Sequence, residues 1–395
     1  MNFAPGHHPR EQPLQLSVNL KVVGLGGAGG VVVDRLAAIG LGASGFLAID
    51  TDSQALQRVV VANKVAIGAK RTRGLGCGGD AGMGRQCIES AGRTMSKQLD
   101  GVEVVLLVAG MGGGLGTGAA PAFAKMAHDQ GALVIALAVM PFDCEGRRRC
   151  EQARAGLDEL IAAADAVIRL PNQHVLEING EDKTAQETFE AANALVLQGV
   201  HGIGRLLRAD GLLTAGLADL RSVLNGRSGE SVLAAAEAEG RSRHRALLDQ
   251  LCSHPFMEKG RVLKEADGLL VSLVGGAEMT MADVNKVTQR IAAHCPDAEV
   301  VLSAAVDPTY QGKLGVTVIT ARGKPEPEPA PVAEPLLETN KKPQKSGGRK
   351  KSKAKQQELG LQALSKGRFD NSEPTLHHGE DLDMPTFLRR NLVLD

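Results

Sequence analysis

Apolar runs separated by glycine-rich turns dominate the first half of the chain. Two unbroken apolar segments, residues 104–109 and 132–140, have the length of strands that are buried on both faces, as in a parallel sheet. Shorter runs at 19–24, 45–50 and 166–170 predict three further strands, and helical stretches follow several of them. This alternation of strand and helix predicts an α/β fold built on a parallel sheet.

A longer amphipathic pattern over residues 184–207 predicts a helix that joins two parts of the chain. Thr184 and Glu187 have the spacing of a capping box, in which a hydroxyl and a carboxylate satisfy the first N–H groups of a helix. Apolar and small residues then recur at steps of three and four and predict one buried face: Phe189, Ala192, Val196, Gly199, Ile203 and Leu207.

The pattern after this helix predicts a smaller mixed α/β region. Residues 228–250 are rich in Ala, Glu and Leu and are expected to be largely helical. Strands are predicted at 268–274, 299–305 and 314–320, with a helix over 281–294. No catalytic constellation stands out here, and the expected role is packing against a neighbouring subunit.

Composition narrows the classes of function. The chain has 395 residues and is 43% hydrophobic, which is enough for two domains with cores of their own. Lys+Arg and Asp+Glu balance at 45 each, and aromatic residues make up only 2%, which argues against stacking on single-stranded nucleic acid. Six cysteines without metal-binding spacing, no apolar segment near the start and no run long enough to cross a bilayer predict a cytoplasmic protein without a metal cluster.

The segment after residues 104–109 is the most informative motif. It contains glycines at 110, 112, 113, 114, 116 and 118 and leads into an Ala-rich stretch that is expected to be helical from residue 119. A strand, a glycine loop and a helix together bind phosphate, because free backbone N–H groups point at the anion and the helix N-terminus adds positive potential. No Lys-Ser/Thr pair closes the loop, so it is not a P-loop of the Walker type.

Two further glycine loops accompany the first. Residues 24–30 follow a predicted strand and read as G-x-G-x-x-G, and the next strand ends in Asp50-Thr51-Asp52. Taken alone, this arrangement is typical of a dinucleotide-binding oxidoreductase. Residues 72–80, which include Cys77, form the third loop. A dinucleotide site needs one such loop, so three loops in one domain favour a single polyphosphate ligand.

Residues 110–121 resemble the signature of the tubulin/FtsZ family, with Leu115 where the family has threonine. Residues 72–79 resemble the family's loop over the terminal phosphate, with Cys77 in place of alanine, and Val31 stands where the family has asparagine. The resemblance implies a tubulin/FtsZ-like GTPase domain with a parallel sheet, a long central helix, a smaller mixed α/β C-terminal domain and a disordered tail. It also implies that GTP or GDP, with Mg²⁺ or K⁺ as an optional companion, contacts Gly26, Gly27, Ala28, Gly29, Gly30, Asp50, Thr51, Asp52, Gly76, Cys77, Gly78, Gly113, Gly114, Leu115, Gly116, Thr117 and Gly118.

Four residues outside the glycine loops complete the implied site. Glu145 and Arg149 lie in a segment that resembles the family's Pro-Phe-x-x-Glu-Gly-x-x-Arg, which contacts ribose and phosphate; a surface ion pair is the alternative. The resemblance makes Phe189 the residue that stacks on guanine and Asn193 the residue that bonds its edge. An acceptor there selects guanine, whose N1–H and N2–H are both donors. Taken alone, Phe189 could equally be a core aromatic.

Residues 211–221 resemble the family's loop that completes hydrolysis in the next subunit. Asp219 and Arg221 match the pattern, but Thr214 replaces an asparagine and Gly216 replaces the first of two aspartates. Groups that position water commonly contribute ~10²–10⁴ in rate. The expected protein is therefore a slow GTPase that polymerises head-to-tail with Asp219 as its catalytic residue, and a filament scaffold without meaningful turnover is the alternative.

The composition changes abruptly after residue 323. A Pro-, Glu- and Lys-rich stretch predicts a disordered tether, whose basic block at 341–355 either contacts an anionic surface or is simply solvated. The last residues resemble the family's C-terminal peptide, which docks on membrane-tethering division proteins through positions equivalent to Asp383, Met384, Pro385, Phe387, Leu388 and Arg389. This implies a role in a division ring.

The expected organisation follows from these patterns. It comprises a disordered extension (1–18), a GTP-binding domain (19–183), a central helix (184–210), the loop region that completes hydrolysis (211–225), a C-terminal α/β domain (226–322), a disordered linker (323–380) and a partner-binding peptide (381–395).

Overall fold

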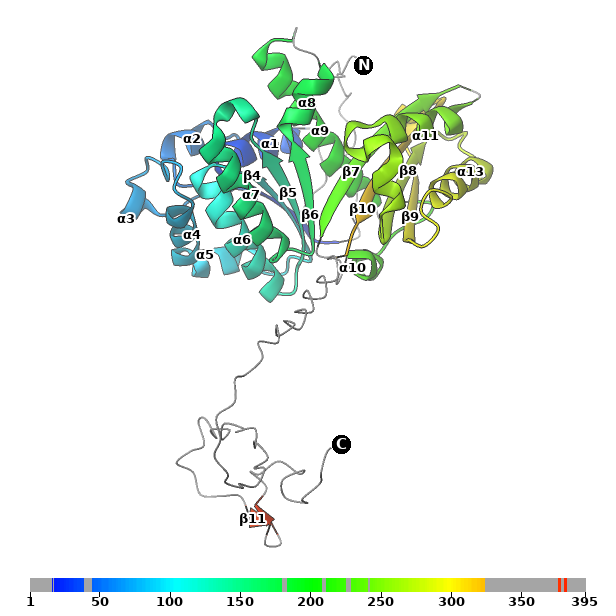
Figure 1. Cartoon of the computed structure of the whole chain (residues 1–395). Coiled ribbons are helices and arrows are strands. Elements are labelled where there is room, and N and C mark those ends of the chain that lie inside the picture. Colours follow the sequence, from blue (N-terminus) through cyan, green and yellow to red (C-terminus); the bar gives the residue numbers. More distant parts are fainter. Residues whose placement is uncertain are drawn as a thin grey trace, which may run out of the picture. The chain divides into compact units, whose positions relative to one another are not determined.

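One long sheet runs through the first compact unit of the chain, residues 1–330 (Figure 1). The computed structural model describes residues 16, 18–38, 45–179, 183–207, 211–224, 229–240 and 242–323, and the backbone of 376–377 and 380–381. The sheet has ten strands in the order β3-β2-β1-β4-β5-β6-β7-β10-β8-β9. The strands are β1 (Leu20–Leu25), β2 (Gly45–Asp50), β3 (Lys64–Ala66), β4 (Val104–Gly110), β5 (Leu133–Met140), β6 (Ala166–Pro171), β7 (Glu230–Glu239), β8 (Gly268–Gly275), β9 (Glu299–Val306) and β10 (Lys313–Ala321).

The strands from β3 to β7 pair in parallel, as the sequence predicts for the first part of the chain. β10 is antiparallel to both β7 and β8, and β8 pairs in parallel with β9. The parallel and mixed parts are therefore continuous, joined where Val167 and Ile168 of β6 face Glu230 and Ser231 of β7. The fold class is confirmed, whereas the domain boundaries given above remain a prediction.

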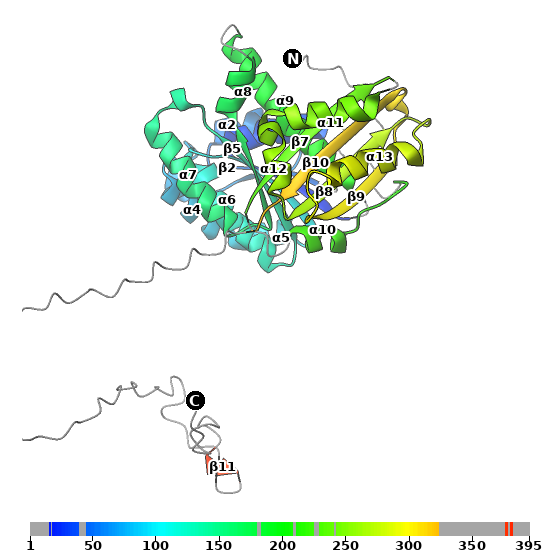
Figure 2. The ribbon, with the colours of Figure 1, turned by 45° about the vertical axis from the view of Figure 1, so that its right-hand side comes forward.

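Helices cover both faces of the sheet. They are α1 (Gly26–Ala38), α2 (Ser53–Arg58), α3 (Ala69–Thr72), α4 (Ala81–Ser90), α5 (Gly92–Gln98), α6 (Gly114–Asp129), α7 (Arg147–Ile161), α8 (Asn172–Asn179), α9 (Ala185–Leu206), α10 (Leu217–Leu224), α11 (Arg243–Ser253), α12 (Arg261–Lys264) and α13 (Met281–Ala292), with 3₁₀ turns η1 (Asp143–Glu145), η2 (Pro255–Gly260) and η3 (Pro308–Tyr310). Alternate residues of β4 point to opposite faces, so one apolar core includes α1, α9 and α10 and a second includes α4 to α7. A third core packs α11, α12 and α13 against β7, β8 and β10 (Figure 2).

The central helix has the predicted cap and the predicted buried face, except that Phe189, which was expected on that face, is exposed. α9 begins after Thr184, whose hydroxyl accepts from the Glu187 N–H while the Glu187 carboxylate accepts from the Thr184 N–H. Its buried face includes Ala192, Val196 and Ile203. These contacts fix the helix against the sheet.

Residues 228–250 were expected to be largely helical, and this expectation is wrong for the first half. Residues 230–239 form β7, and α11 begins only at Arg243. Five of the side chains of β7 are buried, Ser231, Leu233, Ala234, Ala236 and Ala238, and the strand pairs with β10 from Thr320 to Lys313. Pairing with a neighbouring strand and packing under α11 thus override the high helix propensity of Ala and Glu.

The ends of the chain differ in part from the expectation. Leu16 and Val18, which were assigned to a disordered extension, pack against the core. The linker and the partner-binding peptide lie outside the described residues, apart from a short antiparallel pair, β11 (Leu376–His377) and β12 (Glu380–Asp381). Within the part of the chain that is described, no helix is long and apolar enough to cross a membrane.

Candidate functional site

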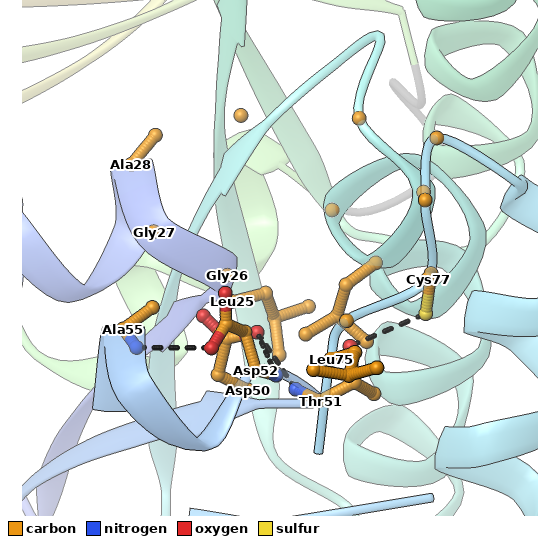
Figure 3. A pocket seen from close by; sticks show the side chains of 18 of the residues that line it. Leu25, Gly26, Gly27, Ala28, Asp50, Thr51, Asp52, Ala55, Leu75 and Cys77 are labelled. Carbon is orange, nitrogen blue, oxygen red and sulfur yellow. Dashed lines mark hydrogen bonds between the residues drawn. The ribbon is translucent and has the colours of Figure 1, made fainter. Parts of the chain in front are cut away.

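A cavity of about 350 Å³ lies at the carboxyl ends of β1, β2 and β4. The turns that follow these strands and the loop between α3 and α4 meet there, and Figure 3 shows Gly26, Gly27 and Ala28 of α1 across the cavity from Leu75 and Cys77. The lining residues are Leu25, Gly26, Gly27, Ala28, Asp50, Thr51, Asp52, Ala55, Leu75, Gly76, Cys77, Gly78, Gly79, Gly110, Gly113, Gly114, Leu115, Gly116 and Arg149. The three glycine loops of the sequence therefore surround one pocket.

The first turn of α1 forms one wall of this pocket. Gly26 begins the helix directly after β1 with φ 71°, a left-handed conformation that glycine adopts without strain. Gly27 and Ala28 follow at the exposed surface of the cavity. Because the first N–H groups of a helix lack intrahelical partners, this turn offers donors and a positive potential to an anion.

The end of β2 supplies two carboxylates and a hydroxyl. The buried Asp50 carboxylate accepts from the N–H groups of Thr51 (2.7 Å) and Asp52 (3.0 Å). Burial raises the pKa of Asp50, although these two N–H groups oppose the shift. Asp52 caps α2 by accepting from the Gln54 and Ala55 N–H groups at 2.8 and 3.1 Å. Both carboxylates thus hold the shape of the turn.

The loop with Gly76, Cys77 and Gly78 forms the opposite wall. Gly76 and Gly78 have φ 79° and 57°, and the Cys77 sulfur lies 3.3 Å from the Thr51 hydroxyl. Burial raises the pKa of the Cys77 thiol, which keeps it protonated near neutral pH. Leu75 is 78% exposed at the rim.

The third wall is the N-terminus of α6, which begins earlier than expected. The sequence predicted a helix from residue 119, whereas α6 starts at Gly114 and includes Gly116 in its first turn. Gly113, Gly114, Leu115 and Gly116 all line the cavity. This part of the glycine motif is a helix N-terminus aimed at the pocket rather than a loop in front of one.

Four of the predicted residues in the glycine loops do not line the cavity but lie in the packing around it: Gly29, Gly30, Thr117 and Gly118. A Cβ on Gly29 would lie 2.7 Å from a carbonyl oxygen of β4, so this glycine lets α1 approach the sheet. A Cβ on Gly118 would lie 1.8 Å from the Ala81 carbonyl oxygen, so this glycine lets α6 pack against α4. The Thr117 hydroxyl accepts from the Gly112 N–H at 2.8 Å and braces the turn before α6.

A row of side chains leads from the cavity towards α9. Arg149 lines the cavity and forms an ion pair with Glu145 at 3.0 Å. Glu145 accepts from the Phe142 N–H at 2.9 Å, and the Phe142 ring meets Phe189 edge to face with centroids 5.1 Å apart. Phe189 is 51% exposed and Asn193, one turn later, is partly buried; neither lines the cavity itself. Phe189 is therefore not a buried core aromatic.

Asp219 lies at the other end of the sheet. It is exposed on α10 and accepts from the Gly216 N–H at 2.8 Å. Arg221 donates to the carbonyl oxygen of Gly131, just before β5, and Ser222 donates to the carboxylate of the first residue of β9. α10 thus sits at the amino ends of these strands, and Figure 1 shows it across the sheet from α2, which borders the cavity.

Sequence reasoning missed six residues at this site. Five of them line the cavity: Leu25, Ala55, Leu75, Gly79 and Gly110. Four of them lie within the three glycine motifs, which could have indicated them, and Ala55 lies in the first turn of α2, just after Asp52. The sixth, Gln152 on α7, donates to carbonyl oxygens of two of the glycine loops, and a single polar residue on an exposed-looking helix gives no signal of this kind. Among the described residues, no cluster of His, Cys, Asp and Glu could hold a metal ion by itself.

Comparisons with known proteins agree with this architecture. Residues 19–180 match the GTPase domain of the tubulin/FtsZ family, and residues 229–323 match the C-terminal domain of the FtsZ family. The fold is similar to an empty FtsZ dimer from M. jannaschii, with a TM-score of 0.71 and 28% identity over 77% of this chain and 88% of that chain.

It is also similar to a GTPγS-bound protofilament of CetZ2 from Haloferax volcanii, with a TM-score of 0.64 and 25% identity over 78% of this chain and 94% of that chain. These matches do not support the alternative of a dinucleotide oxidoreductase. The two family matches span both the half of the sheet that borders the cavity and the C-terminal half. The chain belongs to the tubulin/FtsZ family.

Proposed function

We propose that this protein binds GTP in the glycine-lined cavity and assembles head-to-tail into filaments that hydrolyse it slowly. One observation carries the proposal: the cavity lies at the carboxyl ends of the parallel strands, while Asp219 lies at their amino ends. The seven residues of β4 alone separate the two edges by about 20 Å. One molecule cannot bring its own Asp219 to its own cavity, but a second copy stacked on the first can.

The cavity fits the phosphates of a nucleotide. Two helix N-termini, those of α1 and α6, face it from different sides, and left-handed glycines allow a close approach to the backbone. If the phosphates lie in the cavity, Arg149 and Glu145 are placed to contact the ribose. The exposed Phe189 ring then offers a surface on which the base can stack, and Asn193 supplies the acceptor that selects guanine. If Mg²⁺ or K⁺ accompanies the phosphates, Asp50 and Asp52 are the carboxylates that border the cavity.

The rate of hydrolysis depends on the loop before α10. Gly216 stands where the family has an aspartate, so Asp219 is the carboxylate left to orient water. The Gly216 N–H holds it in place, which favours slow turnover over none. A filament scaffold without turnover is the second candidate, because Gly216 leaves the loop with one carboxylate where the family has two.

The remaining parts of the proposal concern cellular context. We infer that filaments act in a division ring in the cytoplasm and that the peptide containing Pro385 and Phe387 binds membrane-tethering partners. This part rests on the resemblance of the C-terminal peptide, which lies outside the described residues.

The test measures GTP turnover and pelleting against protein concentration for the wild type and for Asp219→Ala. Turnover that rises faster than linearly with concentration, together with pelleting, supports a site completed between subunits. Asp219→Ala should still pellet with GTP but lose turnover by ~10²–10⁴. Pelleting with background turnover in the wild type would identify the scaffold, and failure to bind guanosine nucleotides would overturn the proposal.

A further inference from the structure

We propose that Gln152 is a positioning residue that ties two phosphate-binding loops together and thereby sets the preference for a triphosphate over a diphosphate. The inference rests on the proposed function of the cavity. Gln152 itself does not line the cavity; it lies behind two of its walls, on α7.

The contacts of Gln152 define this role. Its side-chain NH2 group donates to the carbonyl oxygens of Gly79 at 3.0 Å, Gly112 at 3.2 Å and Gly113 at 3.3 Å, so that one of its two hydrogens is shared between two acceptors. The first belongs to the loop between α3 and α4, and the other two belong to the turn between β4 and α6. One partly buried amide thus bridges segments that are far apart in the sequence but adjacent around the cavity.

These hydrogen bonds orient the groups that would meet phosphate. In a trans peptide the N–H points away from the carbonyl oxygen of the same unit. Gln152 holds the carbonyl oxygens of Gly112 and Gly113 on its own side, so the N–H groups of Gly113 and Gly114 point to the other side. Both of these glycines line the cavity. The amide therefore stabilises the peptide orientation that presents donors to an anion.

α7 holds Gln152 firmly. Gly156, one turn further along α7, would place a Cβ 2.2 Å from the Thr117 side chain, so α7 packs closely against α6. The backbone at Arg149 also packs against Gly112, where a Cβ would lie 2.8 Å from the Arg149 carbonyl oxygen. Gln152 therefore contacts the two loops from a helix that close packing holds in place.

The order of the strands indicates which phosphate of a bound nucleotide depends most on the two loops that Gln152 joins. Phe142, which contacts the proposed base-binding ring of Phe189, follows β5, whereas the loop that contains Gly79 follows β3 at the edge of the sheet. A nucleotide with its base at Phe189 therefore extends its phosphates towards the Gly79 loop. The terminal phosphate reaches farthest, so GTP should depend on the bridge more than GDP does.

The experiment measures the Kd of fluorescent GTP and GDP analogues for the full chain and for Gln152→Met, Gln152→Lys and Gln152→Glu, with Tm for each. Gln152→Met removes the donor at similar size, and we expect the Kd for GTP to rise about tenfold and that for GDP to change less than about threefold. Gln152→Lys keeps donors and should retain most of the preference. Gln152→Glu places a carboxylate against three carbonyl oxygens and should bind GTP least well. Gln289→Met, on exposed α13, is the matched control and should match the wild type.

The possible results fall into three groups, which support the inference, overturn it, or overturn the proposed function beneath it. GTP affinity that falls in the order Gln, Lys, Met, Glu, with a loss of GTP preference at nearly constant Tm in the two variants without a donor, supports the inference. Equal losses for GTP and GDP that follow Tm would show a merely structural role and overturn it, as would wild-type values for Gln152→Met. If the wild type binds neither nucleotide, the proposed function itself fails, and that result is distinct from the other two.

Discussion

Two variants that are inactive for different reasons should restore activity to each other when they are mixed. Asp219→Ala keeps an intact cavity but removes the carboxylate at the amino ends of the strands. Gly27→Glu keeps Asp219 but places a carboxylate in the cavity. If the site is completed between subunits, a complete site forms wherever a Gly27→Glu molecule stacks its α10 on the cavity of an Asp219→Ala molecule. The first molecule supplies Asp219, and the second supplies the intact cavity.

The structure indicates that Gly27→Glu will fold. A Cβ on Gly27 would meet nothing within 4 Å, and its φ is not left-handed. Replacing a glycine near a helix N-terminus with glutamate should stabilise the unliganded protein by about 0.5–1 kcal/mol, from helix propensity and from the helix dipole. The same carboxylate occupies the space of a phosphate and repels it. Gly27→Ala is the matched control, which should fold equally well and still bind GTP.

The expected magnitude follows from head-to-tail stacking. In a random equimolar mixture each interface pairs one cavity with one α10, so about a quarter of the interfaces join the two intact halves. Turnover should therefore recover to about a quarter of the wild-type value, while each variant alone stays ~10²–10⁴ below it. The assay is phosphate release at constant total protein as the mixing ratio varies, with a maximum at equal amounts. Activity that is simply the weighted sum of the two variants would refute the reasoning, because it would place cavity and carboxylate in one molecule.

Three further expectations concern stability and accessibility. Gly118→Ala should lower the free energy of unfolding, measured in urea, by about 1–3 kcal/mol, because its Cβ would lie 1.8 Å from the Ala81 carbonyl oxygen. The control is Gly92→Ala, where a Cβ meets nothing within 4 Å, and this substitution should be neutral or stabilising. The rate of Cys77 alkylation, measured by mass spectrometry, should increase as pH rises and should decrease when GTP is added. The exposed Cys144 is the control and should react at the same rate with and without GTP. Equal protection of both cysteines would contradict a nucleotide in this cavity. Burial lowers the pKa of His254 to about 4, from an unfolded value of 6.5. The contribution of His254 to the free energy of unfolding is therefore complete above pH 6.5 and falls by about 3 kcal/mol as pH drops towards 4. This pH dependence should disappear in His254→Asn, which still accepts from the Phe256 N–H, and an unchanged pH slope would refute the assignment.

The sequence was sufficient for elements whose pattern and tertiary environment agree. β4 and β5 are buried on both faces and consist of apolar residues throughout, so their periodicity indicates strands without competition. α9 combines a capping box with a regular apolar face, and its observed start falls where the cap predicts it. In these cases local preference and burial give the same answer.

β7 shows why other elements could not be predicted. Its residues favour a helix when considered locally, and the deciding interaction is a ladder with β10, more than seventy residues later in the sequence. A short window contains no information about that partner. The same limitation applies to Gln152, whose three acceptors lie on segments 39 to 73 residues away.

The glycines of the site show a subtler limit, because one residue type serves two physical purposes. Gly27 has open space where a side chain would begin and a φ that is not left-handed, so a large or charged side chain there would compete with a ligand rather than with the fold. Gly116 and Gly118 have backbone atoms within 2.2 and 1.8 Å of the same point, so a side chain there would compete with the fold. The motif therefore combines open access to a helix N-terminus, where the proposed phosphates would bind, with the close packing that holds that terminus in place. Large or charged substitutions at the first kind of glycine should change affinity with little effect on stability, and substitutions at the second kind should change both.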